Sequence, residues 1–418
     1  MSTLFYRCLA TGLFAFSLPA FTQAQGVPEL PDGHGKELVQ AACVACHLTD
    51  LISNSTGYTN EQWRNVMSKM IDLPEPLAGE IAHYLSNNFP LDTARQPALV
   101  AGDVSVTFQE WNTPTLGQRP RDPLMTPDGM IWWAGMYGSL IGRLNPETGE
   151  MTEWKLDPTA RPHSIINDVE GNIWYTGNGN GTVGKLNPTT GEIDVYPMPD
   201  PAARDPHTPL ILNNGDMWFT LQNSNMLGRI VPDTGDIRLT TMPRERARPY
   251  GIKEDSHGMI WIAYRGSNAI AKVNPDSWEI TEYETPNPNP ESHPGNHYVR
   301  RLAIAEDDTV WYVDSGRGYI GQLNPETGKI KEWSSPSGPQ SHPYAIAVVN
   351  GIVWYNESHQ RPDALVRFDP ANETFQSWAV PSGIGIIRNM NGTPDGNLVI
   401  HQSSSNTVGR VIIADNNN

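Results

Sequence analysis

Residues Glu170–Pro199 have the sequence EGNIWYTGNGNGTVGKLNPTTGEIDVYPMP, and this stretch decides the fold. The segments IWYT and TVGKL are apolar and rich in β-branched residues, and a Gly/Asn turn separates them. A second turn, NPTTG, leads into EIDVYPM, which alternates like a half-buried strand. This combination of apolar runs, alternation and turn residues predicts three short strands joined by tight turns.

The same stretch recurs along the chain, with further copies that open at Asp128, Asn214, His257, Asp307 and Asn350 and a shorter last copy at Asp395. One large apolar residue anchors each copy: Trp132, Trp174, Trp218, Trp261, Trp311, Trp354 and, in the last copy, Leu398. The anchors are 42 to 50 residues apart. A period of this length with several strands per unit is typical of β-propeller blades, so the sequence predicts an all-β seven-bladed propeller.

The two ends of this region complement each other. The seventh copy ends at residues 411–413 and lacks the strand that follows the second turn, whereas residues 104–114, VSVTFQEWNTP, precede the first copy and resemble residues 280–286. We expect residues 104–114 to complete blade seven, because that pairing leaves no open edge strand.

The chain has 418 residues, 46 of them Asp or Glu and 29 Lys or Arg, which gives a net charge of −17. Such acidity argues against nucleic acid or an anionic membrane surface as a partner. It favours a basic protein as partner instead.

Residues 1–24 resemble a secretory signal peptide. Arg7 supplies the positive start, residues 9–21 are mostly apolar, and Thr22-Gln23-Ala24 suits cleavage. The apolar run is too short to span a bilayer, although an uncleaved anchor is the alternative. Cys8 lies directly behind Arg7, which does not suit lipid attachment. We therefore expect a soluble periplasmic protein with no membrane span after removal of the leader.

The motif Cys43-Val44-Ala45-Cys46-His47 has the C-x-x-C-H spacing of covalent haem attachment. Two thiols on one helical turn add to the two vinyl groups of haem, and the adjacent histidine faces the iron. A disulfide redox pair or half of a zinc site are the alternatives. The first would need a βαβ setting and the second another CxxC, and the sequence has neither. We expect one haem c, bound by Cys43 and Cys46 with His47 as axial ligand.

The surrounding residues 27–89 resemble a small all-α class I cytochrome c domain. Residues 35–45 predict the helix that carries the motif, Thr59 to Gln62 form a capping box for a second helix, and residues 80–88 predict a last helix that crosses the first. The sixth iron ligand is assigned to Met70, with three alternatives: Met67, His83 and His34. Residues 90–103 are predicted as the interdomain linker, 104–413 as the propeller and 414–418 as a tail.

Each blade is expected to begin with an innermost strand about twelve residues before its anchor. The side chains at the start of these strands would surround one mouth of the central channel, and we call this set the hub: Arg121, His163, His207, Tyr250, Arg300, Tyr344 and Arg388. Three arginines and two histidines in an acidic chain indicate a site for a small anionic or oxygen-rich polar ligand. The alternative is that water and neighbouring carboxylates fill the channel mouth.

Three segments carry a family resemblance: Arg248-Pro-Tyr-Gly-Ile252, Met217-Trp-Phe-Thr220 and Asn225-Met-Leu-Gly-Arg-Ile230. The pattern resembles the virginiamycin B lyase (streptogramin lyase) family over residues 104–413. The resemblance implies a monomeric seven-bladed propeller. It also implies Mg²⁺-assisted elimination that opens a cyclic depsipeptide ester.

The family's catalytic motifs match this chain in part. Arg161-Pro162-His163 matches an R-P-H motif, and Asp205-Pro206-His207 resembles the E-P-H motif that supplies the base and a metal ligand. Gln222 stands where a second metal-binding glutamate is expected. The resemblance therefore implies His163 and His207 as catalytic residues and Asp205 and Gln222 as Mg²⁺ ligands. The family places this set on its last two blades, where this chain has Tyr344 and Ile387 or Arg388 at the aligned positions.

The haem motif is the strongest chemical signal, so we expect a periplasmic c-type cytochrome that transfers electrons to or from a redox partner protein. The propeller would bind that partner or a small molecule. One alternative is an enzyme, either a carbon–oxygen lyase that eliminates at a cyclic ester or lactone, or a haem-linked oxidoreductase. The other is an interaction scaffold.

Overall fold

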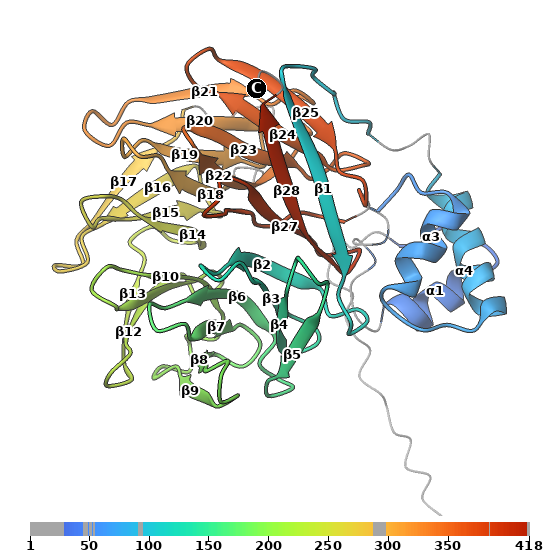
Figure 1. The fold of residues 1–418 in the computed structure, drawn as a ribbon, viewed down its shortest axis with the longest axis horizontal. Helices are drawn as coiled ribbons and strands as arrows, with labels where there is room; N and C mark the ends of the chain where they lie inside the picture. Colours follow the sequence, from blue (N-terminus) through green and yellow to red (C-terminus); the bar gives the residue numbers. More distant parts are fainter. Residues whose placement is uncertain are drawn as a thin grey trace, which may run out of the picture.

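The computed structural model describes residues 29–44, 49, 52, 55–90, 95–286, 298–383 and 385–415. The expected signal peptide, Cys46 and His47 therefore lie outside the described residues. Within them, a helical segment near the N-terminus lies beside a ring of seven four-stranded sheets (Figure 1). No helix in these ranges is long and apolar enough to cross a membrane.

Three helices are described in the helical segment: α1 (Lys36–Cys43), α3 (Asn60–Ser68) and α4 (Glu75–Asn88). The predicted capping box is present, because the Thr59 hydroxyl accepts from the Gln62 N–H and the Gln62 side chain accepts from the Thr59 N–H. Helix α4 begins five residues before the expected start at Glu80. Pro74 caps it and Pro76 occupies its first turn, where a missing N–H costs nothing. Helix α4 packs on α1 at Gly35, where an added Cβ would lie 2.7 Å from the Tyr84 Cβ.

The first three blades follow one another along the chain. Blade 1 consists of β2 (Pro120–Met125), β3 (Ile131–Gly135), β4 (Leu140–Leu144) and β5 (Met151–Lys155). Blade 2 consists of β6 (Pro162–Asn167), β7 (Ile173–Gly177), β8 (Thr182–Leu186) and β9 (Ile193–Pro197). Blade 3 consists of β10 (Pro206–Ile211), β11 (Met217–Leu221), β12 (Met226–Val231) and β13 (Asp236–Thr241).

The remaining blades repeat this order. Blade 4 consists of β14 (Pro249–Glu254), β15 (Ile260–Tyr264), β16 (Ala269–Val273) and β17 (Ile280–Glu284). Blade 5 consists of β18 (Val299–Ile304), β19 (Val310–Asp314), β20 (Tyr319–Leu323) and β21 (Ile330–Ser334). Blade 6 consists of β22 (Pro343–Val349), β23 (Ile352–Glu357), β24 (Ala364–Asp369) and β25 (Thr374–Ala379). Blade 7 consists of β26 (Asn391–Gly392), β27 (Leu398–Gln402), β28 (Thr407–Asp415) and β1 (Val104–Asn112).

The predicted closure is present in blade 7. Strand β1 pairs with β28 in antiparallel register from Val104–Asp415 to Asn112–Thr407, and the two strands lie side by side although they come from opposite ends of the propeller sequence (Figure 1). The first strand of the propeller sequence is therefore the outermost strand of its last blade, and the ring has no unpaired break.

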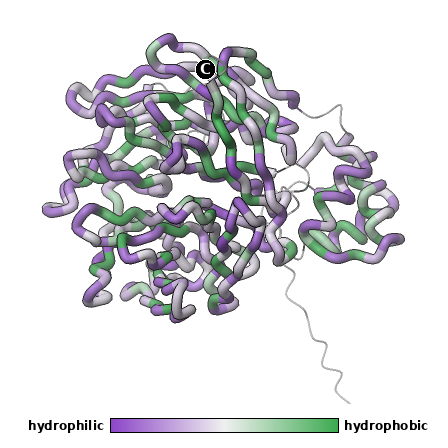
Figure 2. The backbone as a smooth tube through the Cα atoms, viewed as in Figure 1, coloured by the Kyte–Doolittle hydropathy of each residue, from purple (hydrophilic) through white to green (hydrophobic). Residues whose placement is uncertain are grey.

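Apolar residues on the strands fill the space between neighbouring blades. Figure 2 shows apolar stretches that alternate with hydrophilic turns around the ring. The anchor tryptophans are almost completely buried on the second strand of each blade, and several stack on an aromatic side chain of the outermost strand, as Trp132 does on Trp154 at 5.3 Å. Each blade therefore repeats the same packing unit.

The innermost strands begin on one face of the ring, which we call the hub face. Neighbouring strands of a blade are antiparallel, so each strand runs opposite to the one before it. The loop between the second and third strands of a blade therefore lies on the hub face, as does the loop that leads to the next blade. The helical segment contacts such loops: the Gly117 N–H donates to the Lys69 carbonyl at 2.9 Å, and Tyr58 hydrogen-bonds the side chain of Arg361. Gly117 joins blade 7 to blade 1, and Arg361 joins β23 to β24. The helical segment therefore docks on the hub face.

The expected linker is fixed along blade 6 in its described part. The Ala98 N–H donates to the Ser337 hydroxyl at 2.9 Å. Val100 makes a reciprocal pair with Ser377, in which its N–H donates to the hydroxyl at 2.8 Å and its carbonyl accepts from the Ser377 N–H at 2.9 Å. These bonds hold the chain between the helical segment and β1 against the propeller.

The β1–β28 contact provides a test of ring closure. A Cβ added at Gly409 would lie 2.9 Å from the Gln109 carbonyl oxygen on β1. We expect Gly409→Val to separate the two strands and to lower the free energy of unfolding by about 1–3 kcal/mol, as overpacking typically does. Chemical denaturation would measure the loss. Thr107→Ala on the exposed side of β1 is the control, and equal stability of both variants would contradict the closure.

Candidate functional site

The structure brings the hub residues together around the propeller axis. The Tyr250 and Tyr344 hydroxyls are 2.6 Å apart although their strands belong to blades 4 and 6. The Arg300 guanidinium lies 4.1 Å from the centre of the Tyr344 ring and Arg388 lies 5.6 Å from it. Arg121 is 5% exposed, and its Nη2 reaches the Met136 sulfur at 3.6 Å. The starts of the innermost strands thus converge as the repeat predicts.

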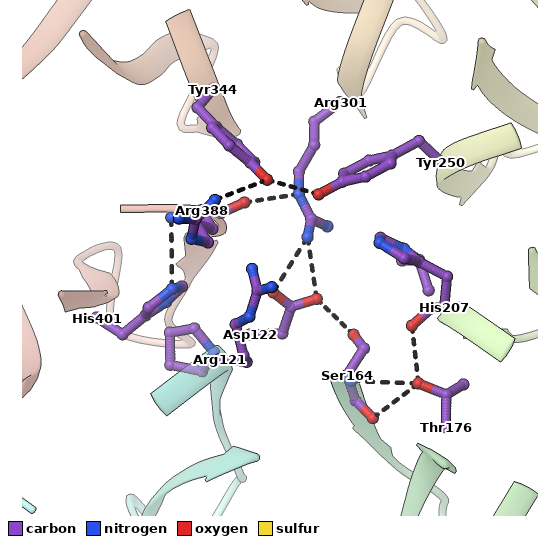
Figure 3. A network of polar contacts seen from close by, with 12 residues as sticks. Arg121, Asp122, Ser164, Thr176, His207, Tyr250, Arg301, Tyr344, Arg388 and His401 are labelled. Atoms are coloured by element: carbon purple, nitrogen blue, oxygen red, sulfur yellow. Dashed lines mark hydrogen bonds and ion pairs between the residues drawn. The ribbon is translucent and has the colours of Figure 1, made fainter. Parts of the chain in front are cut away.

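A buried ion pair crosses the axis beside the tyrosines. Nη2 of Arg301 on β18 lies 3.1 and 3.0 Å from the two carboxylate oxygens of Asp122 on β2. The Arg301 Nε–H also donates to the Arg388 carbonyl at 2.8 Å, and the Ser164 hydroxyl donates to Asp122 at 2.5 Å. Figure 3 shows Arg301 between the tyrosine pair and Asp122. These contacts join blades 1, 2, 5 and 7, and a buried charge needs such pairing.

The tyrosine pair lies in a field of positive charge. Burial opposes ionisation of Tyr344, yet the charges of Arg300, Arg388 and Arg121 and the hydrogen bond with Tyr250 outweigh it and lower the pKa of Tyr344 well below its ordinary value. Burial and the neighbouring Tyr344 raise the pKa of Tyr250. The opposite pKa shifts therefore make Tyr344 the hydroxyl of the pair that ionises first.

His163 and His207 form a close pair of tilted rings at the start of blades 2 and 3. Their ring centroids are 3.6 Å apart, and each residue is 3% exposed. Burial lowers the pKa of each imidazole well below its ordinary value, and the neighbouring arginines add to the shift. His207 Nδ1 is 2.9 Å from the Thr208 hydroxyl. Both rings are therefore neutral at neutral pH, and the lowered pKa makes each a weaker base than a free imidazole.

The residues expected to bind Mg²⁺ have other partners. The two carboxylate oxygens of Asp205 accept from the Asn223 N–H at 2.5 Å and from the Ser224 N–H and hydroxyl at 3.0 and 2.6 Å. Gln222 is half-buried in the turn beside them. Among the described residues no group of three or more His, Cys, Asp or Glu side chains is placed to hold a metal ion. In this geometry Asp205 shapes the turn after β11.

The haem residues are described only in part. Cys43 ends α1 and packs against the helical core, which also includes Val39, Trp63 and Met67. Met67 is 6% exposed, whereas Met70 follows α3 and is half-buried. The alternative ligands His34 and His83 are exposed.

The sequence repeat does not predict three of the side chains in this site. Asp122 and Arg301 each follow a predicted hub residue, and His401 lies on β27 with its Nε2 3.4 Å from the Arg388 N–H. The pairing of β2 with β3 and of β18 with β19 shifts register at these positions. Such a bulge turns two successive side chains toward the same side. Two adjacent charged residues at a strand start, Arg121-Asp122 and Arg300-Arg301, are the signal that could have revealed them.

The comparisons with known proteins agree with this geometry. The virginiamycin B lyase family profile matches residues 93–215. A virginiamycin B lyase from Staphylococcus aureus superposes with a TM-score of 0.65 at 24% identity and covers 73% of this chain and 99% of its own. The propeller is virginiamycin B lyase-like. A streptogramin B lyase gives a TM-score of 0.66 at 23% identity, over 74% of this chain and 98% of its own.

A more distant propeller shows how general this architecture is. The WD40 propeller domain of Doa1 superposes with a TM-score of 0.59 at 14% identity and covers 74% of this chain. No curated protein matches the sequence. Identities at this level establish the seven-bladed fold, and they leave the activity to be argued from the site itself.

The lowered pKa of Tyr344 is measurable. The groups that face it are Tyr250 on β14, Arg121 on β2, Arg300 on β18 and Arg388 before β26, with His342 beside its own strand. We expect the tyrosinate absorbance of the folded protein to begin rising well below pH 10, and Tyr344→Phe to remove that first step. Tyr175→Phe is the control, because burial raises the pKa of Tyr175 to about 12.

The lowered pKa of Tyr344 makes the free energy of unfolding depend on pH. Between the folded and unfolded pKa values of Tyr344, the folded protein is ionised and the unfolded chain is neutral, so unfolding takes up one proton. This contribution to stability is present at high pH and is lost as the pH falls through the lowered pKa. A first absorbance step that survives in Tyr344→Phe would show that another tyrosine is ionised.

Proposed function

We propose that the chain is a periplasmic c-type cytochrome in which haem c on the helical segment transfers electrons and the lyase-like propeller binds a redox partner or a small molecule. The observation that carries this proposal is the position of Cys43. It ends α1 against a packed helical core, so the C-x-x-C-H motif begins beside that core. Export of a soluble protein through residues 1–24 is part of the proposal, as is a monomeric state.

The described part of the helical segment fits haem. The indole N–H of Trp63 is buried and has no acceptor among the described residues. A buried donor of this kind suits a carboxylate such as a haem propionate. Val44, inside the motif, and Ile71, after Met70, are 37% and 40% exposed. Exposed apolar side chains on both sides of the proposed ligands suit a large apolar ring.

The chain's own residues would bind and tune the group. Cys43 and Cys46 would hold haem c through thioether bonds, with His47 and Met70 as axial ligands. When bound, haem c supplies one-electron transfer. Val39 and Trp63 exclude water from the core beside it. The net charge of −17 favours docking of a basic redox partner, and salt would weaken that encounter.

Haem attachment is the direct test of this proposal. Replacement of both thiols in Cys43→Ala/Cys46→Ala should abolish covalent haem, because no thioether bond can form. Haem staining of a denaturing gel would measure the loss. Mature protein from a periplasmic fraction is the material to use. Staining that persists in the double variant, or none in the parent protein, would refute the cytochrome assignment.

The axial ligand is a second test. A methionine sulfur on ferric haem gives a weak long-wavelength absorption band and raises the reduction potential relative to two histidines. Met67 fills the helical core, whereas Met70 lies beyond α3 and is not needed to fill it. We expect Met70→Ala to remove the band and Met67→Ala to retain it while lowering stability. The opposite result would move the ligand to Met67, and no band in the parent would favour His83 or an open sixth position.

A lyase is the second candidate, and the close His163–His207 pair is the observation that favours it. A neutral buried imidazole can act as general base at neutral pH, and His163 would orient His207. The lyase would open a cyclic ester or lactone by elimination. Asp205 would have to release its bonds to Asn223 and Ser224 before it could hold Mg²⁺.

The lyase candidate has its own test. If the hub eliminates at a lactone or cyclic depsipeptide, His207→Ala should lower turnover by about 10²–10⁴-fold while haem content stays unchanged. The measurement is ring opening of such substrates with and without Mg²⁺. Turnover that needs Mg²⁺ and vanishes in the variant would establish the lyase. If the parent protein shows no turnover, the remaining candidate functions are electron transfer and a pure interaction scaffold. Reduction of the haem would support electron transfer, because a scaffold needs no redox activity.

A further inference from the structure

The hub holds more positive charge than the described residues neutralise. Arg121, Arg300 and Arg301 are each between 4% and 6% exposed, and Arg388 is half-buried. Among the described residues, Asp122 is the only carboxylate that accepts hydrogen bonds from these four guanidiniums. Both of its bonds come from Arg301. The remaining three cations face Tyr344 and one another. Buried charge without a counterion is costly, so this arrangement needs a further negative group.

Several hub donors also lack an acceptor in the described part of the chain. They are Nε and Nη1 of Arg121, Nε of Arg300 and Nε of Arg388. The burial of an N–H group without an acceptor costs about 1–3 kcal/mol, and more for a charged group. Four such atoms on three arginines therefore indicate that an acceptor with several oxygens is missing from the hub. The imidazole nitrogens Nδ1 of His163 and His401 are also buried without a partner.

We propose that Arg121, Arg300 and Arg388 bind the carboxylate or phosphate group of a small anionic ligand. Guanidinium groups match both oxyanions through paired N–H donors. This inference deepens the small-molecule role of the propeller in the proposed function, but it does not depend on haem. The three arginines are also not the residues on which the lyase candidate rests, which are His163, His207 and Asp205.

The approach to the site lies on the hub face. Arg119 lies 4.7 Å from the centre of the Tyr137 ring and hydrogen-bonds its hydroxyl, and the exposed Arg161 lies 5.9 Å from the same ring. Burial and the nearby Arg121 lower the pKa of Arg119 to about 9, so its charge is also destabilised without an anion. A line of guanidiniums thus leads from the surface to the hub. In an acidic protein such a local patch attracts anions.

Anion binding would also move a proton. Among the described residues, Tyr344 supplies a negative charge beside Arg300 and Arg388 once its phenol ionises (Figure 3 shows Tyr344 and Arg388). An oxyanion that takes over these guanidiniums removes the stabilisation of the phenolate. Tyr344 then takes one proton from solvent and becomes a neutral hydrogen-bond donor to the ligand or to Tyr250. At a pH above the lowered pKa of Tyr344, ligand binding is therefore coupled to uptake of up to one proton.

The test uses the full-length haem-loaded protein at low ionic strength, with inorganic phosphate and succinate as the two probes. Calorimetry should show saturable binding of at least one probe, and the tyrosinate absorbance should fall as the site fills. Arg300→Gln should weaken binding by at least about tenfold, since a hydrogen bond to a charged group is lost. Arg300 donates no described hydrogen bond to the protein, so its replacement orphans no partner.

The control is Arg143→Gln. It removes the same charge from the outer part of blade 1, where Arg143 lies over Trp132 and Trp154, and it should leave binding unchanged. No saturable binding of either probe, or equal affinity of Arg300→Gln and parent, would overturn the proposal. A response to phosphate alone or succinate alone identifies the type of oxyanion. The Cys43→Ala/Cys46→Ala variant, assayed in parallel, should bind the same probe, which separates failure of the haem assignment from failure of the anion site.

Discussion

The pairing of β1 with β28 is the constraint on which the rest of the molecule depends. Blade 7 has only a two-residue innermost strand of its own, and its outermost strand comes from the start of the propeller. Without this pairing β28 would expose a full row of backbone donors and acceptors. The hub forms only when the innermost strands of all seven blades begin at the same distance from the axis. Its geometry therefore depends on closure of the whole ring rather than on any single blade.

The hub in turn explains why the interior of an acidic protein is so cationic. The buried arginines are held by Asp122, by the Arg388 carbonyl and by the tyrosine pair. Asp122 has a φ of 38°, in the left-handed region that side chains rarely adopt, and the ion pair to Arg301 keeps it there. Strain of this kind persists only where the surroundings enforce it. The carboxylate is thus a fixed part of the scaffold and is not available as a mobile counterion.

The sequence predicts the parts of this structure that depend on the repeat. The anchors from Trp132 to Leu398 establish the number of blades, and the missing last strand predicts the role of residues 104–114, of which 104–112 form β1. The strand starts predict that Tyr250, Arg300 and Tyr344 converge. The repeat does not predict Asp122 or Arg301, because the register shifts in β2 and β18 break the simple alternation. Nor does it reveal that Asp205 is engaged by Ser224, because a turn's hydrogen bonds depend on local backbone geometry rather than on residue type.

The helical segment and the ring are joined so that neither end of β1 is free. Upstream of β1, Val100 pairs with Ser377 on blade 6, and downstream the Gly117 N–H binds the carbonyl of Lys69 after α3. A Cβ at Gly117 would lie 2.6 Å from the Met70 carbonyl oxygen, so the loop that begins blade 1 fits closely against the residue assigned as axial ligand. Displacement of β1 would therefore open blade 7 and disturb the end of α3 together. Because Gly117 lies in a loop on the hub face, docking of the helical segment and the approach to the buried arginines are set by the same short part of the chain.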